Sequence, residues 1–356
     1  MIRYGVLRRA TRIAAVMLAT LLGLSACQQG GESDGAEKTG PAAFYDGRNI
    51  RWIIPYSPGG GYDEYARLIS PFLEKYTGAR LDIVNLMGAG GMRGANALFN
   101  APKNGLTIGL INGSALVVNE LAGMRGAEYK IAEFDYIGRI VADKRVFAVS
   151  LDSGYETIQE VLGANSDFKV GATGLGGSTY LDAVIFNKAL NRELDIVHGF
   201  DSSSVVKQSM LRGNIAGTWG SWGSAVEAVD TGQHRVLLQS GRKRLEDLPD
   251  VPTAFELVDL TDDPERTRAI LSAWETLHEV GRPLAAPPGT PPERLEFLRE
   301  AFRQAMHDPE LLAIAERTNR PLDYASAEEM NRIIQEATDM APDLESLFVR
   351  AVKGEL

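Results

Sequence analysis

Two glycine-rich stretches hold the polar residues whose types and spacing could do chemistry. The first reads SPGGGYD over residues 57–63, and the second reads GLGGST over residues 174–179. Each stretch follows an apolar, β-type run and precedes a helical pattern. Glycines let a backbone approach a ligand closely, and the first turn of a helix offers unpaired N–H groups and a partial positive charge of about half a unit. Both stretches are therefore candidate anion sites.

The anion that suits these stretches is a carboxylate rather than a nucleotide phosphate. Neither stretch is a Walker A motif, because no Gly-Lys-Ser/Thr follows the glycines, and neither has the G-x-G-x-x-G spacing. Hydroxyl groups beside free amides favour a carboxylate. A side chain at Gly60 is expected to clash with a positive φ or to fill the space of the anion.

Three polar residues in these stretches each have two interpretations. Asp63 either caps the helix that follows it or accepts a hydrogen bond from a ligand or a bridging water. Ser178 and Thr179 are good N-cap residues, and an N-cap hydroxyl can still face a ligand. Glu64 is more simply explained as an acid that complements the helix dipole.

A third candidate is the segment GTWGSWG, residues 217–223. Glycines pack poorly around a large ring, and ligand pockets are rich in aromatic side chains, so Trp219 and Ser221 are candidate pocket-lining residues. The alternative is that the tryptophan makes a core contact between layers.

The residues that catalysis or metal binding would need are not apparent. There is no G-x-S-x-G motif and no histidine placed to activate a nucleophile. The four histidines lack His-x-x-x-His spacing, Cys27 is the only cysteine, and His198 is better explained as a buried or turn residue. We expect no catalytic residue, no metal and no cofactor. The formal net charge of −10 argues against nucleic acid as a partner.

The elements that must position the candidate residues alternate short β-rich runs with helical patterns. This alternation begins near residue 50 and restarts near residue 157, which predicts an α/β fold with mostly parallel strands. One glycine-rich stretch in each half would let the two halves close on a ligand. Pro71 lies inside the first helical pattern and should kink or end that helix. The late, nearly all-helical tail should pack back on an existing sheet.

The N-terminus predicts export. Residues 1–26 combine four arginines with an apolar run too short to span a bilayer, and the sequence LSAC that ends at Cys27 resembles a lipobox. The alternative is an ordinary signal peptide with a chance cysteine. We expect lipidation at Cys27, an extracytoplasmic (periplasmic) and membrane-anchored protein, and a flexible tether over residues 27–47.

Six segments in order resemble the Bug-type extracytoplasmic solute receptors of tripartite tricarboxylate transporters. They are PYSPGGGYDEYAR, VNLMGAGGMRGAN, APKNGLTIG, GATGLGGSTY, LPDVPT and APPGTPPERLEFLREAF. The resemblance implies a two-lobed fold like that of type II periplasmic binding proteins, with the ligand between the lobes. It places domain I at residues 48–145 plus 277–356 and domain II at residues 146–276.

The resemblance also implies a function and a set of ligand-binding residues. A monomeric receptor of this kind captures a small organic acid and delivers it to membrane permease subunits; a sensor, or a hydrolase that uses the same cleft, are the alternatives. The implied ligand-binding residues are Ser57, Gly59, Gly60, Asp63, Asn112, Ser114, Gly176, Gly177, Ser178 and Thr179. Gly61, Tyr62 and the two tryptophans of the third segment depart from the usual family pattern, so the particular acid is not implied.

Overall fold

The computed structural model describes residues 39–356, of which Pro41–Leu356 form one compact unit. The predicted signal peptide, Cys27 and the first part of the predicted tether lie outside the described residues. The tether prediction extends too far, because Gly40–Tyr45 form helix α2. Tyr45 is fully buried, stacks on Phe297 and donates from Oη to the carbonyl of Gly105 at 2.9 Å. An aromatic residue thus docks a segment whose composition had indicated a tether.

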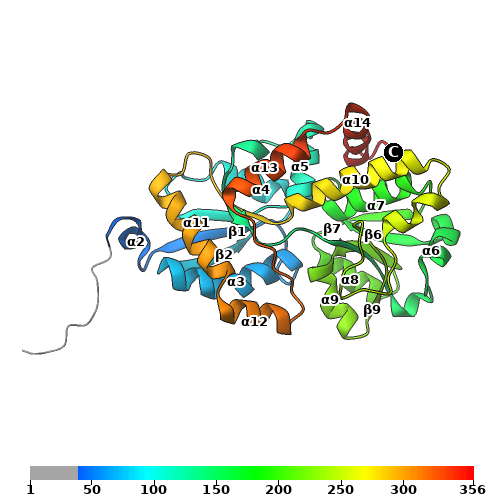
Figure 1. The fold of residues 1–356 in the computed structure, drawn as a ribbon, viewed down its shortest axis with the longest axis horizontal. Coiled ribbons are helices and arrows are strands. Elements are labelled where there is room, and N and C mark those ends of the chain that lie inside the picture. The colour runs from blue at the N-terminus through cyan, green and yellow to red at the C-terminus, as the bar shows by residue number, and fades with distance from the viewer. Residues whose placement is uncertain (1–38) are drawn as a thin grey trace, which may run out of the picture. The chain divides into compact units, whose positions relative to one another are not determined.

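Two five-stranded sheets form the centres of two lobes (Figure 1), which confirms the predicted two-lobed α/β fold. The strand order is β2-β1-β3-β10-β4 in the first sheet and β7-β6-β8-β5-β9 in the second. The first sheet contains β1 (Asn49–Ile54), β2 (Arg80–Asn85), β3 (Thr107–Leu110), β4 (Asp135–Arg139) and β10 (Pro283–Ala286). The second contains β5 (Arg145–Ser150), β6 (Lys169–Thr173), β7 (Asp195–Phe200), β8 (Gly217–Ser221) and β9 (His234–Gln239).

Each sheet has one strand that runs against its neighbours. Strand β10 pairs antiparallel with β3 and β4, and β5 pairs antiparallel with β8 and β9, whereas the pairs β1–β2, β1–β3, β6–β7 and β6–β8 are parallel. The two antiparallel strands are the ones that follow a crossing between the sheets. The chain leaves β4 for β5 through residues 140–144 and returns to β10 after a helix. The four residues PLAA of β10 were too few to predict a strand.

Helices cover both sheets. Around the first sheet lie α3 (Gly61–Thr77), α4 (Met92–Phe99), α5 (Gly113–Leu121), α11 (Pro292–Met306), α12 (Pro309–Arg317) and α13 (Ala327–Thr338). The helices around the second sheet are α6 (Ile158–Ala164), α7 (Ser178–Ala189), α8 (Ser203–Leu211) and α9 (Trp222–Asp230). The short helices are η1 (Ala89–Gly91), η2 (Ile131–Glu133), η3 (Leu151–Ser153), η4 (Asn165–Asp167) and η5 (Ala254–Leu260).

Two further helices connect the lobes. Both α10 (Pro264–Val280) and α14 (Pro342–Val352) pack against α5 and also against α7, as their neighbouring positions in Figure 1 show. Of the other tail helices, α11 and α13 pack on β4 as expected. The tail therefore supports both lobes, whereas the sequence predicted only that it would cover a sheet.

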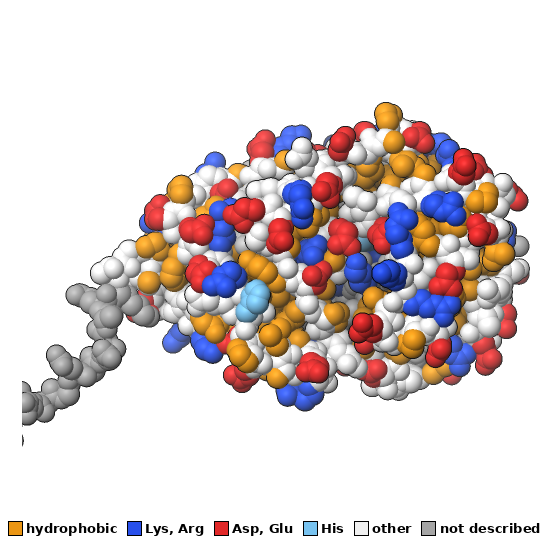
Figure 2. Space-filling model, in the orientation of Figure 1, with side chains coloured by type: hydrophobic (Ala, Val, Ile, Leu, Met, Phe, Trp, Pro, Cys, Tyr) orange, Lys and Arg blue, Asp and Glu red, His pale blue; other side chains and the backbone are white. Residues whose placement is uncertain are grey.

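Helix α3 continues through Pro71 without ending there. Tyr65, Ile69 and Phe72 are buried on one face of the helix, while Pro71 is exposed. A proline in a helix interior removes one hydrogen bond and crowds the preceding turn, but the burial of this apolar face outweighs that cost. No helix of the described residues is long and apolar enough to cross a membrane. Side chains of both charges are interspersed over the face shown in Figure 2.

Candidate functional site

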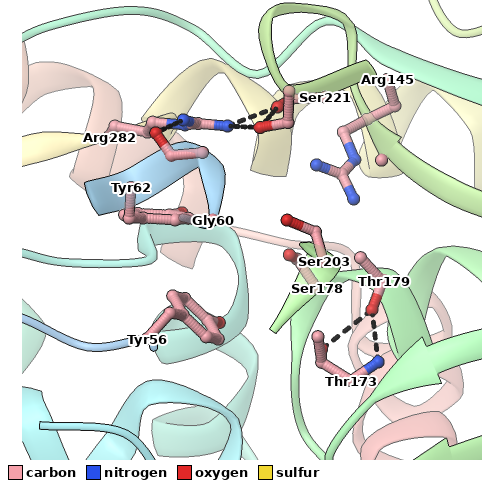
Figure 3. Close-up of a pocket in the computed structure, with 13 residues that line it drawn as sticks. Tyr56, Gly60, Tyr62, Arg145, Thr173, Ser178, Thr179, Ser203, Ser221 and Arg282 are labelled. Atoms are coloured by element: carbon pink, nitrogen blue, oxygen red, sulfur yellow. Dashed lines mark hydrogen bonds between the residues drawn. The ribbon is translucent and has the colours of Figure 1, made fainter. Parts of the chain in front are cut away.

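A cavity of about 40 Å³ lies where the two glycine-rich loops meet, between the lobes. Four helix N-termini converge on it, those of α3, α7, α8 and α9 (Figure 3). Its lining residues are Tyr56, Gly60, Gly61, Tyr62, Arg145, Thr173, Ser178, Thr179, Ser203, Gly220, Ser221, Ser224 and Arg282. The positive ends of four helix dipoles therefore point at one small space, which favours an anion there.

Three of these four helices have no side-chain cap. Gly60 precedes α3, Gly177 precedes α7 and Ser221 precedes α9, and none of them accepts a hydrogen bond from its own helix through a side chain. Only α8 is capped, by the side chain of Ser202, which accepts from the Val205 N–H. The first-turn amides of the uncapped helices therefore remain available to a ligand or to water.

Arg282 closes one side of the cavity and connects three parts of the chain. Its Nε donates to Asp143 Oδ1 at 3.1 Å, its Nη1 to the Gly61 carbonyl at 2.8 Å, and its Nη2 to Ser224 Oγ at 2.9 Å and to Ser221 Oγ. The guanidinium also lies 4.5 Å from the centre of the Tyr62 ring. Arg282 thus fastens the first glycine loop to α9 of the other lobe.

Arg145, the first residue of strand β5 in the second sheet, also lines the cavity. Its Nε donates to Asp182 Oδ2 at 2.8 Å, and its Nη2 contacts the same oxygen. Its Nη1 lies 3.8 Å from Asp143 Oδ2, which is beyond hydrogen-bond distance. Figure 3 shows the guanidinium extending toward the hydroxyls of Ser203 and Ser178. Nη1 is therefore a charged donor that a ligand in the cavity can use.

The buried charges around the cavity balance one another. Arg145, Arg282, Asp143 and Asp182 are each less than 6% exposed. Burial alone would raise the pKa of the Asp182 carboxyl, but the charge of Arg145 holds it below its usual value. Burial alone would lower the pKa of the Arg145 guanidinium, but Asp182 and Asp143 hold it above its usual value. Both groups therefore stay charged, and a bound anion would be met by the helix N-termini and the spare donor of Arg145.

Asp63 does not line the cavity, although the sequence placed it among the candidate ligand-binding residues. Its carboxylate accepts from Gly59 N–H at 3.0 Å, Arg67 Nε at 2.8 Å and Asn85 Nδ2 at 3.0 Å. Burial would raise the pKa of this carboxyl, but these hydrogen bonds hold it below its usual value. Asp63 holds the first loop in shape from within. Ser57, whose buried Oγ has no protein partner, and Gly59 also lie outside the lining.

The crowded glycine of the first loop is Gly61, not Gly60. Gly60 lines the cavity, but its φ of −91° is an ordinary value, so the expected positive φ is wrong; the positive φ of 75° belongs to Gly59. A Cβ on Gly60 would meet its nearest atoms at 3.5 Å, whereas one on Gly61 would lie 1.8 Å from Ser224 Oγ. The first loop needs a glycine where it presses on α9 of the other lobe.

Residues of the second loop do face the cavity. Ser178 and Thr179 line it, and Thr179 Oγ1 accepts from the Thr173 N–H at 2.8 Å. Gly176 and Gly177 lie behind the lining: the Gly176 carbonyl accepts from Asn119 Nδ2 at 3.0 Å, and a Cβ on Gly177 would lie 2.4 Å from Thr173 Oγ1.

The remaining predicted residues divide between the cavity and its surroundings. Asn112 Nδ2 donates to Ser178 Oγ at 3.2 Å and to Tyr56 Oη at 2.5 Å, and Ser114 Oγ donates to Asn112 Oδ1 at 3.4 Å. Asn112 and Ser114 therefore support the lining from behind. Ser221 lines the cavity. Trp219 does not line this cavity: it is 1% exposed and packs against the rings of Phe147, Phe186 and Trp274. It also borders a smaller neighbouring cavity, so it fits both interpretations that the sequence left open.

Sequence reasoning missed the two arginines and Tyr62. Burial raises the pKa of the Tyr62 hydroxyl well above its usual value, so this group stays a donor, and its buried Oη has no protein partner. Arg282 is an isolated cation in the apolar segment VGRPLAA, and Arg145 follows Asp143 and Lys144 in the crossing that leads into β5. The isolated cation of the one crossing and the charged run Asp143–Arg145 of the other were the available signals. Among the described residues, no three His, Cys, Asp or Glu side chains are grouped as a metal site would need.

Comparisons with known proteins agree with this architecture. The structure of the periplasmic binding protein BugD superposes with a TM-score of 0.73 at 19% identity, covering 86% of this chain and 98% of that one. The structure of MatC from Rhodopseudomonas palustris with bound malate superposes with a TM-score of 0.69 at 20% identity, covering 85% and 99%. A protein of Pseudomonas sp. strain P51, described as the UPF0065 protein in the tcbD-tcbE intergenic region, is 28% identical over 272 residues, which are 75% of this chain and 76% of the relative.

The two sheets and the cavity between them define a two-lobed α/β protein with the same fold as these periplasmic proteins. The model of the tripartite tricarboxylate transporter family receptor matches residues 66–344. Because this match covers more than half of the chain, the protein belongs to the tripartite tricarboxylate transporter receptor family, a family of receptors and not of enzymes.

Proposed function

We propose that the cavity between the lobes binds a carboxylate group of a small organic acid. The observation that carries this proposal is the convergence of four helix N-termini, three of them without side-chain caps, on one small cavity. The malate bound by MatC and the adipate bound by Rpa4515 of R. palustris are organic acids of this kind.

In this proposal, different lining residues bind different parts of the carboxylate group. First-turn amides of α3 and α7 and the hydroxyls of Ser178 and Thr179 hold the carboxylate oxygens. Arg145 Nη1 and Tyr62 Oη supply the remaining donors, and the other donors of both arginines stay with protein oxygens. No lining residue is paired as a nucleophile with a base. The protein therefore binds its ligand without transforming it.

We further propose how the receptor works in its setting. It acts as an extracytoplasmic monomer, anchored to the membrane through lipid on Cys27, and hands the acid to the permease subunits of a tripartite tricarboxylate-type transporter. The lobes that close on the acid are residues 48–145 with 277–356, and residues 146–276. Arg282 and Asp143 lie at the two crossings between these lobes and pair at 3.1 Å, so the closing motion turns about them.

Ligand screening by thermal shift, followed by calorimetry, tests the proposal. A ligand that binds only the folded protein stabilises it by about 2.7 kcal/mol at a hundredfold excess over Kd. We expect stabilisation by small di- and tricarboxylates such as succinate, malate and citrate, and none by neutral sugars or amines. Stabilisation by sugars or amines alone, or turnover of a bound acid, would overturn the proposal.

A further inference from the structure

A second cavity of about 30 Å³ continues from the first into the second lobe. It lies between the second sheet and helices α8 and α9, and its apolar walls are Val146, Ala148, Val206, Trp219 and Ala225. The two cavities share four lining residues, which are Thr179, Ser203, Gly220 and Ser224. Because these four residues border both spaces, a ligand in the first cavity meets the entrance of the second.

Gly220 lies at the junction of the two cavities. It stands within strand β8, and a Cβ added there would meet no atom within 4 Å. A residue in the middle of a five-stranded sheet normally has its side-chain space filled by neighbours. The open space over Gly220 is therefore a passage between the cavities, and glycine keeps it wide.

The second cavity has a cation that no carboxylate neutralises. Lys207 lines the cavity, and its Nζ donates to the Ser224 carbonyl at 3.1 Å. Among the described residues, no Asp or Glu forms an ion pair with Lys207, although the chain has 47 acidic residues against 37 basic ones. An ammonium has three donors, so Lys207 has donors left for a ligand.

His234 adds an unpartnered polar atom to the same cavity. The residue is 3% exposed, and its Nε2 has no hydrogen-bond partner in the protein. Burial, together with the charge of Lys207, lowers the pKa of His234 to about 4. His234 is therefore neutral near pH 7, where its ring can present an N–H beside the Lys207 ammonium.

We propose that the ligand is a two-ended organic acid whose second anionic group binds to Lys207 and His234 in the second cavity. The first carboxylate lies at the four helix N-termini, and an apolar chain passes over Gly220 between the two ends. An apolar tail alone would cover the remaining donors and the charge of the Lys207 ammonium without giving them a partner, which is costly. This inference rests on the proposed function, because it assumes that the first cavity holds a carboxylate.

Calorimetry with a chain-length series tests the inference. The probes are straight-chain α,ω-dicarboxylates of four to eight carbons and the monocarboxylates of the same lengths. We expect wild-type protein to prefer a dicarboxylate over its matched monocarboxylate, and Lys207→Met to weaken dicarboxylate binding about ten- to hundredfold while leaving monocarboxylates unchanged. Lys188→Met, which removes an exposed lysine from α7 of the same lobe, is the charge-matched control and should change neither.

A second variant tests the passage independently of charge. Gly220→Val should fill the junction, so long dicarboxylates should lose affinity more than the shortest ones. Equal loss for all chain lengths would overturn the placement of the chain over Gly220. Equal binding of mono- and dicarboxylates by both wild-type protein and Lys207→Met would overturn the inference and leave the proposed function standing. If no carboxylate of either series binds to the wild-type protein, the proposed function itself fails.

Discussion

In the first lobe the glycine loop is stabilised both by contacts within its own lobe and by a contact with the other lobe. Asp63 accepts four hydrogen bonds from three residues of its own lobe, and Arg282 connects the Gly61 carbonyl to α9 of the other lobe. In the second lobe the loop is supported from behind, by Thr173 on Thr179 and by Asn112 on Ser178, so both hydroxyl-bearing residues border the cavity.

The difference shows that one local pattern can serve two purposes. Both loops read as a strand, then glycines, then a helix start, and both present helix N-termini to the cavity. The first loop uses its glycine to let the lobes meet, because Gly61 presses on Ser224. The second uses its glycines to fit closely against Asn119 and Thr173, which brings Ser178 and Thr179 to the ligand. Partners distant in the sequence decide which role each loop takes.

The largest effect is expected at Arg145, which anchors the second loop's helix α7 through Asp182. Arg145→Met would leave the buried Asp182 carboxylate without its guanidinium partner, which costs about 3–5 kcal/mol in the free energy of unfolding. Urea denaturation measures this loss. Arg303→Met, which breaks an exposed ion pair with Glu300, should change the free energy of unfolding far less, because water screens such a pair. Similar losses in the two variants would show that Arg145 does not anchor α7.

The next largest effect separates Gly61 from Gly60. Gly61→Ala would place a methyl group against Ser224, whose Oγ also accepts from Arg282. Overpacking of this kind costs about 1–3 kcal/mol. Because the contact joins opposite lobes, we expect this cost to fall on the closing of the lobes over a ligand. Ligand affinity should therefore fall about tenfold or more, while the free energy of unfolding without ligand changes less.

Gly60→Ala is the matched control for this prediction. Its added methyl group would lie at ordinary contact distance from Ser202 and Ser57, and affinity should change less than about threefold. Calorimetry on both folded variants measures the difference. A greater loss of affinity in Gly60→Ala than in Gly61→Ala would mean that the first loop contacts the ligand through Gly60 rather than meeting the other lobe through Gly61.

A third pair of variants compares the polar residues of the two loops. Asp63→Asn should reduce the free energy of unfolding by about 1–3 kcal/mol at neutral pH, because charge-assisted hydrogen bonds are lost. The folded-state pKa of Asp63 lies below its usual value, so its stabilising effect is complete above the unfolded pKa and is lost as pH falls through the folded one. The gap between wild type and Asp63→Asn should therefore close as the pH falls below about 4.

Ser178→Ala is the counterpart in the second loop. It should weaken ligand affinity about three- to tenfold, as expected for one hydroxyl contact, with a smaller change in the free energy of unfolding than Asp63→Asn causes. Denaturation curves between pH 3 and 7, together with calorimetry, measure both quantities. If Asp63→Asn kept the free energy of unfolding of wild type but lost ligand affinity, Asp63 would be a ligand-binding residue after all.

The smallest effect is expected at Ser57. Its buried Oγ has no hydrogen-bond partner and does not line the cavity. Ser57→Ala should therefore leave the free energy of unfolding unchanged or slightly higher, and ligand affinity should change less than about threefold. A tenfold loss of affinity in calorimetry would show that Ser57 reaches the ligand after all.

The sequence by itself determined the local units and, through them, the class of protein. Alternating β-rich and helical runs predicted the α/β halves, and the order strand, glycines, helix predicted helix N-termini after the glycines near residues 60 and 176. Helices α3 and α7 begin there, at Gly61 and Ser178, and both residues line the cavity. These patterns are readable because periodicity, glycine conformation and helix capping act between residues that are close along the chain. The order of six such segments then indicated the family to which the chain belongs.

Only the tertiary structure decided which side chains face the ligand space. Arg282 bonds to the carbonyl of Gly61, 221 positions away, and Asn112 to Ser178, 66 positions away. Asp63 accepts a hydrogen bond from Asn85, which lies at a neighbouring strand end 22 positions away. Strand β10 runs antiparallel because the chain returns to the first sheet from the other lobe. None of these outcomes follows from local spacing, because each depends on burial and hydrogen bonding that exist only after distant segments have met.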